Sequence, residues 1–263
     1  MSNNQTPRPK DVPEPKIIAE TDDYLVINKP AKLAVHGGGN LREKTLADWL
    51  EKHYPKIIGV GEDSIRPGIV HRLDKDVSGL MVIAKNQKSF LSLKNQFKNR
   101  TVKKIYTALV YGSIESDFGT IDFSIVRAKS GQRMAALPAN AADLLSRRHP
   151  RNRDQGNIER WFKSRTALTE FQVIKRFVNY TLLKVVIKTG RTHQIRVHFF
   201  AYGHPLVGDS LYNTKKTRLK NQKLDLGRIF LVATELSFKD LREQRQSFII
   251  DLPSELKIVL PEH

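Results

Sequence analysis

The sequence contains no cysteine, and this absence removes several kinds of chemistry at once. Disulfide bridges, metal sites with thiolate ligands and a cysteine nucleophile are all excluded. No apolar run approaches the roughly 20 residues that a membrane-spanning helix needs. Residues 1–15 are polar, contain four prolines and lack the apolar core of a secretion signal, so we interpret them as a flexible N-terminal arm. We therefore expect a cytoplasmic protein that makes no contact with membranes.

Acidic residues are few compared with basic ones. The 263 residues include 45 Lys and Arg against 27 Asp and Glu, which gives a formal net charge of +18. A field of this sign attracts polyanions, and nucleic acid is the commonest of them in a cytoplasm. The cations are also clustered: residues 85–104 contain seven and no acid, and residues 215–228 contain six and one acid. We therefore expect a nucleic-acid partner, the alternative being a basic surface that serves only solubility.

Short strand patterns outnumber helical ones along the chain. Helices are predicted near residues 45–53, 88–98 and 192–203 and after Pro253. Strands are predicted at 16–20, 24–28, 68–74, 79–84, 105–110, 118–123, 166–174, 180–187, 230–233, 235–238 and 247–250, with those at 105–110 and 118–123 meeting around Gly112. Because strands and helices do not alternate regularly, the predicted fold class is α+β, with a large mixed, mostly antiparallel sheet flanked by helices and loops. We expect one domain over residues 16–263, with a basic surface insertion at about 138–161.

The first candidate site is the segment His71–Asp74, where polar groups crowd the predicted end of an apolar strand. A carboxylate fixed at such a position, Asp74, could serve as a nucleophile or a base. The alternative is a solvated turn in which Asp74 pairs with Arg72 or Lys75. Asp74 and Asp76 together also suggest glycoside hydrolysis or metal binding. Two carboxylates on a turn, without a histidine on a helix, are however weak evidence for a metal site.

The second candidate site is the segment Thr189–His198, which begins at a glycine turn and continues into a predicted helix. One interpretation is a basic amphipathic helix. The other is a set of hydrogen-bond donors, including Arg191 and Arg196, that binds an acidic ligand or RNA. His193 and His198 are five residues apart, which is poor spacing for two ligands of one zinc ion, so we predict no metal site.

The third candidate site is the segment Lys103–Leu109, in which Tyr106 lies on a predicted strand beside basic residues. A tyrosine on a strand usually packs in the core or at its edge. Next to lysines, its ring could instead carry a stacked base. The pattern alone leaves both interpretations open.

Taken together, these segments resemble the RluA-type pseudouridine synthases, and the resemblance runs from about residue 17 to 260. The stretch His36–Gly38 further resembles the RluC kind, which acts on large-subunit ribosomal RNA. The matching segments, in chain order, are Asn28–Pro30, Gly68–Leu80, Lys104–Val110, Thr189–His198 and Gly203–Tyr212.

The resemblance implies an isomerase that converts uridine to pseudouridine in RNA after flipping the base out of the stack, with neither a metal nor an organic cofactor. It implies three catalytic residues: Asp74 as the reacting carboxylate, Tyr106 stacked on the uracil, and Arg196 beside Asp74 as its charge partner. Arg72 would fill the gap left by the flipped base, and Leu73 and Ile195 would line the pocket unless they serve only the core. The remaining implied RNA or uridine contacts are His71, Lys104, Arg191, His193 and Gln194.

The sequence also departs from the family pattern at several positions. Val77 replaces a usual threonine, Val232 a common histidine and Asn213 a usual glycine. The basic insertion is unusual, and 15 N-terminal residues are too few for the RNA-binding module that many relatives carry. We expect a monomer that acts on 23S ribosomal RNA. These departures concern the identity of the RNA target more than the chemistry of the reaction.

Three other functions remain open from the sequence. The same chemistry could act on transfer RNA. A catalytically silent RNA-binding or ribosome-assembly factor could keep the basic surface, although such a protein would not need Asp74, Tyr106 and Arg196. A metal-dependent nuclease would use Asp74, Asp76 and the histidines, and it would lose activity in EDTA.

Overall fold

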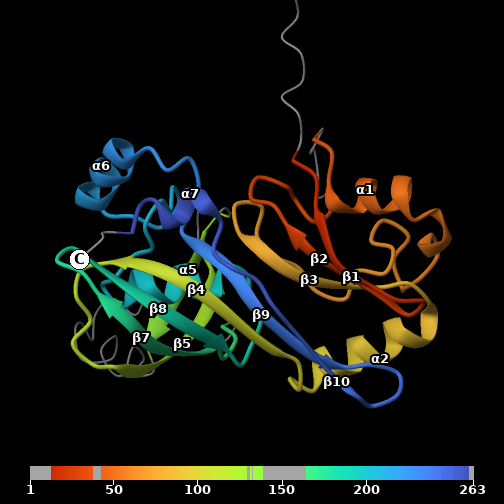
Figure 1. Cartoon of the computed structure of the whole chain (residues 1–263). Coiled ribbons are helices and arrows are strands. Elements are labelled where there is room, and N and C mark those ends of the chain that lie inside the picture. Colours follow the sequence, from red (N-terminus) through yellow and green to blue (C-terminus); the bar gives the residue numbers. More distant parts are fainter. Residues whose placement is uncertain (1–12, 38–42, 129–130, 132, 139–163, 261–263) are drawn as a thin grey trace, which may run out of the picture. The chain divides into compact units, whose positions relative to one another are not determined.

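The computed structural model describes residues 13–37, 43–128, 131, 133–138 and 164–260 (Figure 1). The described residues group into two compact units: unit 1 takes those up to Phe97 together with Lys239–Gln244, and unit 2 takes those of Lys98–Phe238 together with those from Arg245 onward. The predicted arm and the predicted basic insertion lie outside the described residues, apart from residues 13–15 and 138. No helix in the part of the chain that the structure describes is long and apolar enough to cross a membrane.

Among its described residues, unit 1 contains three antiparallel strands and two helices. The pairing of β2 and β3 runs from Tyr24 opposite Ala84 to Lys29 opposite Gly79 without interruption. Every residue of β3 is buried, so this strand is a rigid support for the segment that precedes it. The elements are β1 (Lys16–Glu20), β2 (Tyr24–Lys29), α1 (Leu46–His53), a 3-10 turn η1 (Pro55–Ile57), β3 (Ser78–Ala84) and α2 (Gln87–Lys98).

Helix α1 begins where the sequence predicts, because Thr45 closes a capping box. The Thr45 Oγ1 atom accepts the backbone N–H of Asp48 at 3.3 Å, and the Asp48 carboxylate accepts the N–H of Thr45 at 2.7 Å. Two of the helix's otherwise unpaired N–H groups are thereby satisfied. The apolar face, with Leu46 and Leu50, is fully buried.

Unit 2 is a seven-stranded sheet among the described residues, with three helices around it. Its strand order is β9-β4-β8-β7-β5-β6, and β10 pairs with β9. Helix α5 packs against β5, β6 and β7. The elements are β4 (Lys103–Tyr111), β5 (Phe118–Arg127), β6 (Met134–Pro138), β7 (Leu168–Arg176), β8 (Tyr180–Ile187), α5 (Gln194–Ala201), α6 (Lys215–Leu224), β9 (Leu231–Lys239), β10 (Arg245–Ile249) and α7 (Ser254–Lys257).

The pairings β1·β2, β2·β3, β4·β8, β4·β9, β5·β6, β5·β7 and β7·β8 are all antiparallel, which confirms the predicted α+β class with a mostly antiparallel sheet. Three local predictions were wrong. Residues 68–74 form no strand beyond a single bridge between Ile69 and Ile83, because Gly68 turns the chain there. Strands β4 and β5 are not neighbours, since β4 lies between β9 and β8. The two strands predicted at 230–238 are one, β9, and helix α6 was not predicted because its sequence lacks an apolar stripe.

Candidate active site

In unit 1, the segment that leads to Asp74 is fixed to β3 at Gly68. This residue has φ +69°, and an added Cβ would lie 2.2 Å from the carbonyl oxygen of Ala84, so only glycine fits. The backbone of Ala84 donates to the Gly68 carbonyl at 2.9 Å, and Gly68 donates to the carbonyl of Val60 at 2.8 Å. The segment therefore leaves β3 in a fixed direction.

His71 is held by β3 and α2 of the same unit. Its Nε2 atom accepts the backbone N–H of Val82 at 3.1 Å, which leaves the proton of the neutral ring on Nδ1. The ring stacks on Phe97, with 4.5 Å between centroids. His71 thus braces the segment just before Asp74, and its implied contact with RNA stays a prediction.

Lys29 holds the other side of the same segment. Its side chain has no exposed surface, and Nζ donates to the carbonyls of Pro30 and Leu33 at 2.8 Å and of Lys75 at 3.2 Å. A buried ammonium group must be satisfied by hydrogen bonds, and carbonyl oxygens do so here. Because Lys75 follows Asp74, this contact restrains the loop that carries the half-buried Asp74 carboxylate.

Arg72 is exposed and contacts His36. Its Nη1 atom donates to His36 Nε2 at 2.9 Å, while His36 Nδ1–H donates to the carbonyl of Gly37 at 3.0 Å. This pattern requires the neutral histidine with its proton on Nδ1. Leu73, next along the chain, is 4% exposed and so belongs to the core by burial.

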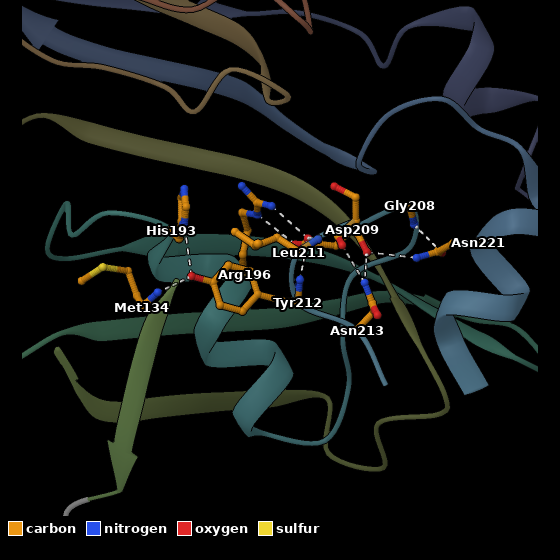
Figure 2. Close-up of polar contacts among 10 residues, drawn as sticks. Met134, His193, Arg196, Gly208, Asp209, Leu211, Tyr212, Asn213 and Asn221 are labelled. Atoms are coloured by element: carbon orange, nitrogen blue, oxygen red, sulfur yellow. Dashed lines mark hydrogen bonds and ion pairs between the residues drawn. The ribbon is translucent and has the colours of Figure 1, made fainter. Parts of the chain in front are cut away.

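In unit 2, Arg196 forms a buried, two-point ion pair with Asp209 (Figure 2). The Arg196 Nε and Nη2 atoms donate to the two carboxylate oxygens of Asp209 at 2.8 and 2.9 Å. The Arg196 and Asp209 side chains are 5% and 0% exposed. The Asp209 carboxylate also accepts the backbone N–H groups of Leu211 and Tyr212 at 2.8 and 2.9 Å, so both of its oxygens are engaged. Two parallel hydrogen bonds fix the plane of the guanidinium as well as its position.

Tyr212 lies against the same guanidinium and joins it to two other elements. Its ring centroid is 5.3 Å from Cζ of Arg196, within the range of a cation–π contact. The Tyr212 hydroxyl accepts the backbone N–H of Met134 at 2.7 Å and lies 3.0 Å from Nδ1 of His193 (Figure 2). One residue therefore connects Arg196, strand β6 and the residue that caps α5.

The turn that carries Asp209 is fixed to the sheet and to α6. Gly208 has φ +75°, and an added Cβ would lie 2.0 Å from the carbonyl oxygen of Arg228, so glycine is required there. Asn221 of α6 accepts the N–H of Gly208 at 2.8 Å and donates to the Asp209 carbonyl at 3.1 Å (Figure 2). Asn213, which departs from the family pattern, donates to the same carbonyl at 3.1 Å. The Asp209 turn is thus held from both sides.

Tyr106 lies on β4 beside an irregularity in the sheet. In the β4·β9 pairing, Ile105 is opposite Glu235 and Tyr106 is opposite Ala233, so β9 contains one extra residue, Thr234. Such a bulge locally bends the strands and changes the direction of nearby side chains, and bulges are frequent beside active sites. Tyr106 is 6% exposed.

Gln194 organises the loop before α5. Its Oε1 atom accepts from the Thr189 hydroxyl at 2.7 Å and from the N–H of Arg191 at 3.0 Å. Its Nε2 atom donates to the Leu168 carbonyl and the Thr169 hydroxyl, each at 3.0 Å. The full hydrogen-bonding capacity of the amide is used inside the protein. Gln194 therefore braces the loop, and its implied contact with uridine is untested.

Lys104 and Arg191 belong to this same region of unit 2. Lys104 Nζ lies 3.5 Å from the position that a Cβ would take at Gly190. Burial lowers the pKa of Lys104 to about 8. Burial also lowers the pKa of Arg191, and repulsion from Arg165 and Arg100 lowers it further.

Helix α5 is buried over its first six residues, so the interpretation as a basic amphipathic helix was wrong. Ile195 is 5% exposed, and the His193 backbone is left-handed, with φ 55°. His198 is fully buried, its Nε2–H donates to the Phe123 carbonyl at 2.9 Å, and burial lowers its pKa. Among the residues the structure describes, no group of three His, Asp or Glu side chains could hold a metal ion.

Each unit thus carries part of the predicted set. Unit 1 contributes His71, Arg72, Leu73 and Asp74, and unit 2 contributes Lys104, Tyr106, Arg191, His193, Gln194, Ile195 and Arg196. The structural roles of Lys29, Asp209 and Tyr212 were not predicted from the sequence. All three lie in segments that match the family pattern, Asn28–Pro30 and Gly203–Tyr212, and that match was the only available signal. The departures Val77 and Val232 are both buried, as ordinary core residues are.

Comparisons with known proteins identify the family of this chain. A family model described as RNA pseudouridylate synthase matches residues 23–201, more than half of the chain. Among curated proteins, an uncharacterized RNA pseudouridine synthase of Aquifex aeolicus is 38% identical over 264 residues, covering 97% of this chain and 76% of that protein. Ribosomal large subunit pseudouridine synthase D of Borreliella burgdorferi is 33% identical over 254 residues, covering 96% of this chain and 69% of that protein.

Ribosomal large subunit pseudouridine synthase D of Pseudomonas aeruginosa is 40% identical over 200 residues, covering 76% of this chain and 53% of that protein. The chain spans less than two thirds of the length of several curated relatives, including this one and a Bacillus subtilis protein at 58%. Among solved structures, human RNA pseudouridylate synthase domain containing 1 superposes with a TM-score of 0.68 at 25% identity, covering 93% of this chain and 86% of that one. The relatives named here for a ribosomal target are synthases D, so the closer likeness to the RluC kind is not confirmed.

Proposed function

Because the chain belongs to the RNA pseudouridylate synthase family, we propose that it is an isomerase that converts uridine to pseudouridine in large-subunit ribosomal RNA. The observation that carries this proposal is the family match over residues 23–201. Relatives named ribosomal large subunit pseudouridine synthase D support the choice of RNA. The net charge of +18 suits a polyanionic substrate.

In the proposed reaction, the bond between C1′ of the ribose and N1 of uracil breaks. The uracil rotates, C1′ bonds to C5, and the proton released from C5 is balanced by the proton that N1 gains. Asp74 either attacks C1′ or removes a sugar proton to start the reaction. Both routes need an ionised carboxylate at neutral pH, which a nearby guanidinium favours.

We assign Arg196 as that guanidinium and Tyr106 as the ring that stacks on the flipped uracil. The buried pair with Asp209 uses Nε and Nη2 of Arg196, so the orientation of its remaining Nη1 edge is fixed. Flipping a base costs a few kcal/mol of stacking and pairing. Phosphate contacts from the basic surface offset this cost, and the exposed Arg72 side chain fills the vacated position. We expect the protein to act as a monomer in the cytoplasm.

The test is a map of pseudouridines in total cellular RNA with and without the gene, combined with an assay on transcribed large-subunit RNA in excess EDTA. The proposal predicts that at least one pseudouridine of that RNA disappears with the gene and is formed by the purified protein in EDTA. Loss of pseudouridine only from transfer RNA would contradict the proposed target. No change in any RNA, together with RNA binding by the protein, would favour the silent RNA-binding factor that the charge alone also permits.

A further inference from the structure

Three arginines from distant parts of the sequence gather in unit 2 around the loop before α5. Arg191 lies in that loop, Arg165 in a segment bridged to β5, and Arg100 in the turn before β4. The Arg191 Nε atom donates to the carbonyl of Thr166 at 3.2 Å, which places its guanidinium beside the backbone that carries Arg165. Ile125 and Arg165 exchange both backbone hydrogen bonds, at 2.8 and 2.9 Å. The positions of Arg165 and Arg191 are therefore fixed by the fold.

Arg165 and Arg100 each repel the guanidinium group of Arg191. Repulsion from Arg165 and Arg100 adds to burial in lowering the pKa of Arg191, so the charges are close enough to interact. Within the described residues, no carboxylate forms an ion pair with any of the three. Other surface arginines of this chain do have such partners, as Arg176 does in Asp117 at 2.6 Å. A cluster of like charges without a counterion is unfavourable by itself, and an anion would relieve it.

The surroundings of the cluster are also suited to an extended polyanion. Arg100 and Arg165 are exposed, so a strand of nucleic acid can reach them without entering a closed cavity. Lys104 approaches the same loop at Gly190, where the missing side chain leaves room for its ammonium group. The loop continues directly into α5, which carries Arg196.

We propose that Arg100, Arg165 and Arg191 form a binding site for a backbone phosphate of the RNA substrate. The planar guanidinium group matches the geometry of phosphate oxygens and binds them through two parallel hydrogen bonds. A phosphate contact carries no sequence information, but it fixes the register of the strand. The site therefore holds the RNA backbone at a set position beside the loop and helix that carry Arg196. This inference rests on the proposed function only in that RNA is taken as the polyanion.

The test compares the double variant Arg100→Gln/Arg165→Gln with the wild type in binding to a labelled RNA stem-loop, measured over a series of salt concentrations. Both residues are exposed and outside the core, and thermal unfolding checks that the variant folds. The control Lys52→Gln/Lys56→Gln removes the same charge from exposed positions of unit 1. The variant Arg100→Lys/Arg165→Lys keeps the charge but loses the two-point geometry.

For the double glutamine variant we expect Kd to rise roughly tenfold per arginine, because each hydrogen bond to a charged group contributes about that factor. We also expect the slope of log K against log salt to fall by about one, because the site holds one phosphate. The control should keep the wild-type slope, and the lysine variant should keep the slope with a weaker Kd. An unchanged slope in the glutamine variant, an equal fall in the control, or no RNA binding by the wild type would each overturn the site.

Pseudouridine formation in the same samples separates this inference from the proposed function. A wild-type protein that binds RNA with the expected slope and makes no pseudouridine would contradict the activity and leave the phosphate site standing. A protein that makes pseudouridine while the double glutamine variant binds like the wild type would contradict the site alone. In that case the arginines would serve another anion, such as an acidic protein segment.

Discussion

The Arg196 guanidinium and the Asp209 carboxylate form two parallel hydrogen bonds in the interior of unit 2, 13 residues apart in the chain. The Asp209 carboxylate also accepts two backbone N–H groups, and the Tyr212 ring packs against the Arg196 guanidinium. Because both charges are buried, neither residue can be replaced without leaving the other uncompensated. Asp209 thus fixes the side chain that we propose acts beside the reacting carboxylate.

The first prediction concerns this pair. Asp209→Asn keeps the shape of the side chain but removes the negative charge that compensates the buried Arg196 guanidinium, which costs about 3–5 kcal/mol of folding free energy. Urea unfolding measures the loss, and turnover on RNA should fall with it. The control is Asp117→Asn, which breaks the exposed pair with Arg176 and should cost less than about 1 kcal/mol. Equal costs in the two variants would show that burial of the Arg196–Asp209 pair is unimportant.

The second prediction separates the hydroxyl of Tyr106 from its ring. Tyr106→Phe keeps the stacking surface, so we expect RNA affinity within about twofold of the wild type. If the hydroxyl moves a proton in the reaction, single-turnover rates should fall by about 100-fold or more. The control Tyr180→Phe removes a hydroxyl from β8 of the same sheet and should leave the rate unchanged. A wild-type rate in Tyr106→Phe would remove the hydroxyl from the mechanism.

The third prediction uses the pKa of Lys104, which burial lowers to about 8. Below pH 8 the ammonium is charged and can contact RNA, and above pH 8 the free protein loses this charge. We expect RNA affinity to weaken between pH 7 and 9 in the wild type, while Lys104→Arg stays charged over that range. The measurement is Kd at constant salt for both proteins.

Unfolding cannot produce that loss, as the sign of the linkage shows. Burial disfavours the charged lysine in the folded state, so the contribution of Lys104 to stability increases as pH rises from about 8 toward its ordinary pKa near 10.5. Thermal unfolding at pH 7 and 9 checks this point. A pH profile of RNA affinity that is the same in the wild type and in Lys104→Arg would contradict the assignment.

The fourth prediction concerns Lys29. Lys29→Met keeps the length of the side chain but leaves the carbonyls of Pro30, Leu33 and Lys75 without their donor. Each unsatisfied buried acceptor costs about 1–3 kcal/mol, so unfolding should become easier by several kcal/mol. Lys16→Met, at an exposed position of β1, is the control. A variant as stable as the control would mean that the ammonium does not hold the Asp74 loop.

Local features of this fold could be predicted from the sequence because local contacts determine them. Helix α1, which Thr45 caps, and strands β1 and β2 are formed by residues close together in the chain, and all three occur where they were predicted. Strand β4 was expected to meet β5 around Gly112, but its neighbours are β8 and β9, which come much later in the chain. Helix α6 escaped prediction because capping and Asn221, rather than an apolar stripe, hold it.

The candidate site, like the fold, could be predicted only in part. Residue types and spacing made Asp74, Tyr106 and Arg196 candidates, and the family resemblance supplied their roles. The pairing of Arg196 with Asp209 depends on a turn whose position is set by Gly208 and α6, and no pattern in the sequence encodes that approach. The cluster of Arg100, Arg165 and Arg191 is similarly invisible, since three distant segments meet only in the folded chain.

The most direct test of the account is the amount of pseudouridine that purified Asp74→Asn forms in transcribed large-subunit RNA, measured beside its affinity for that RNA. The substitution keeps the size of the side chain and removes the carboxylate, so we expect wild-type affinity and no detectable product at any enzyme concentration. Appreciable product from Asp74→Asn, at a rate within about tenfold of the wild type, would show that the reaction does not depend on this carboxylate.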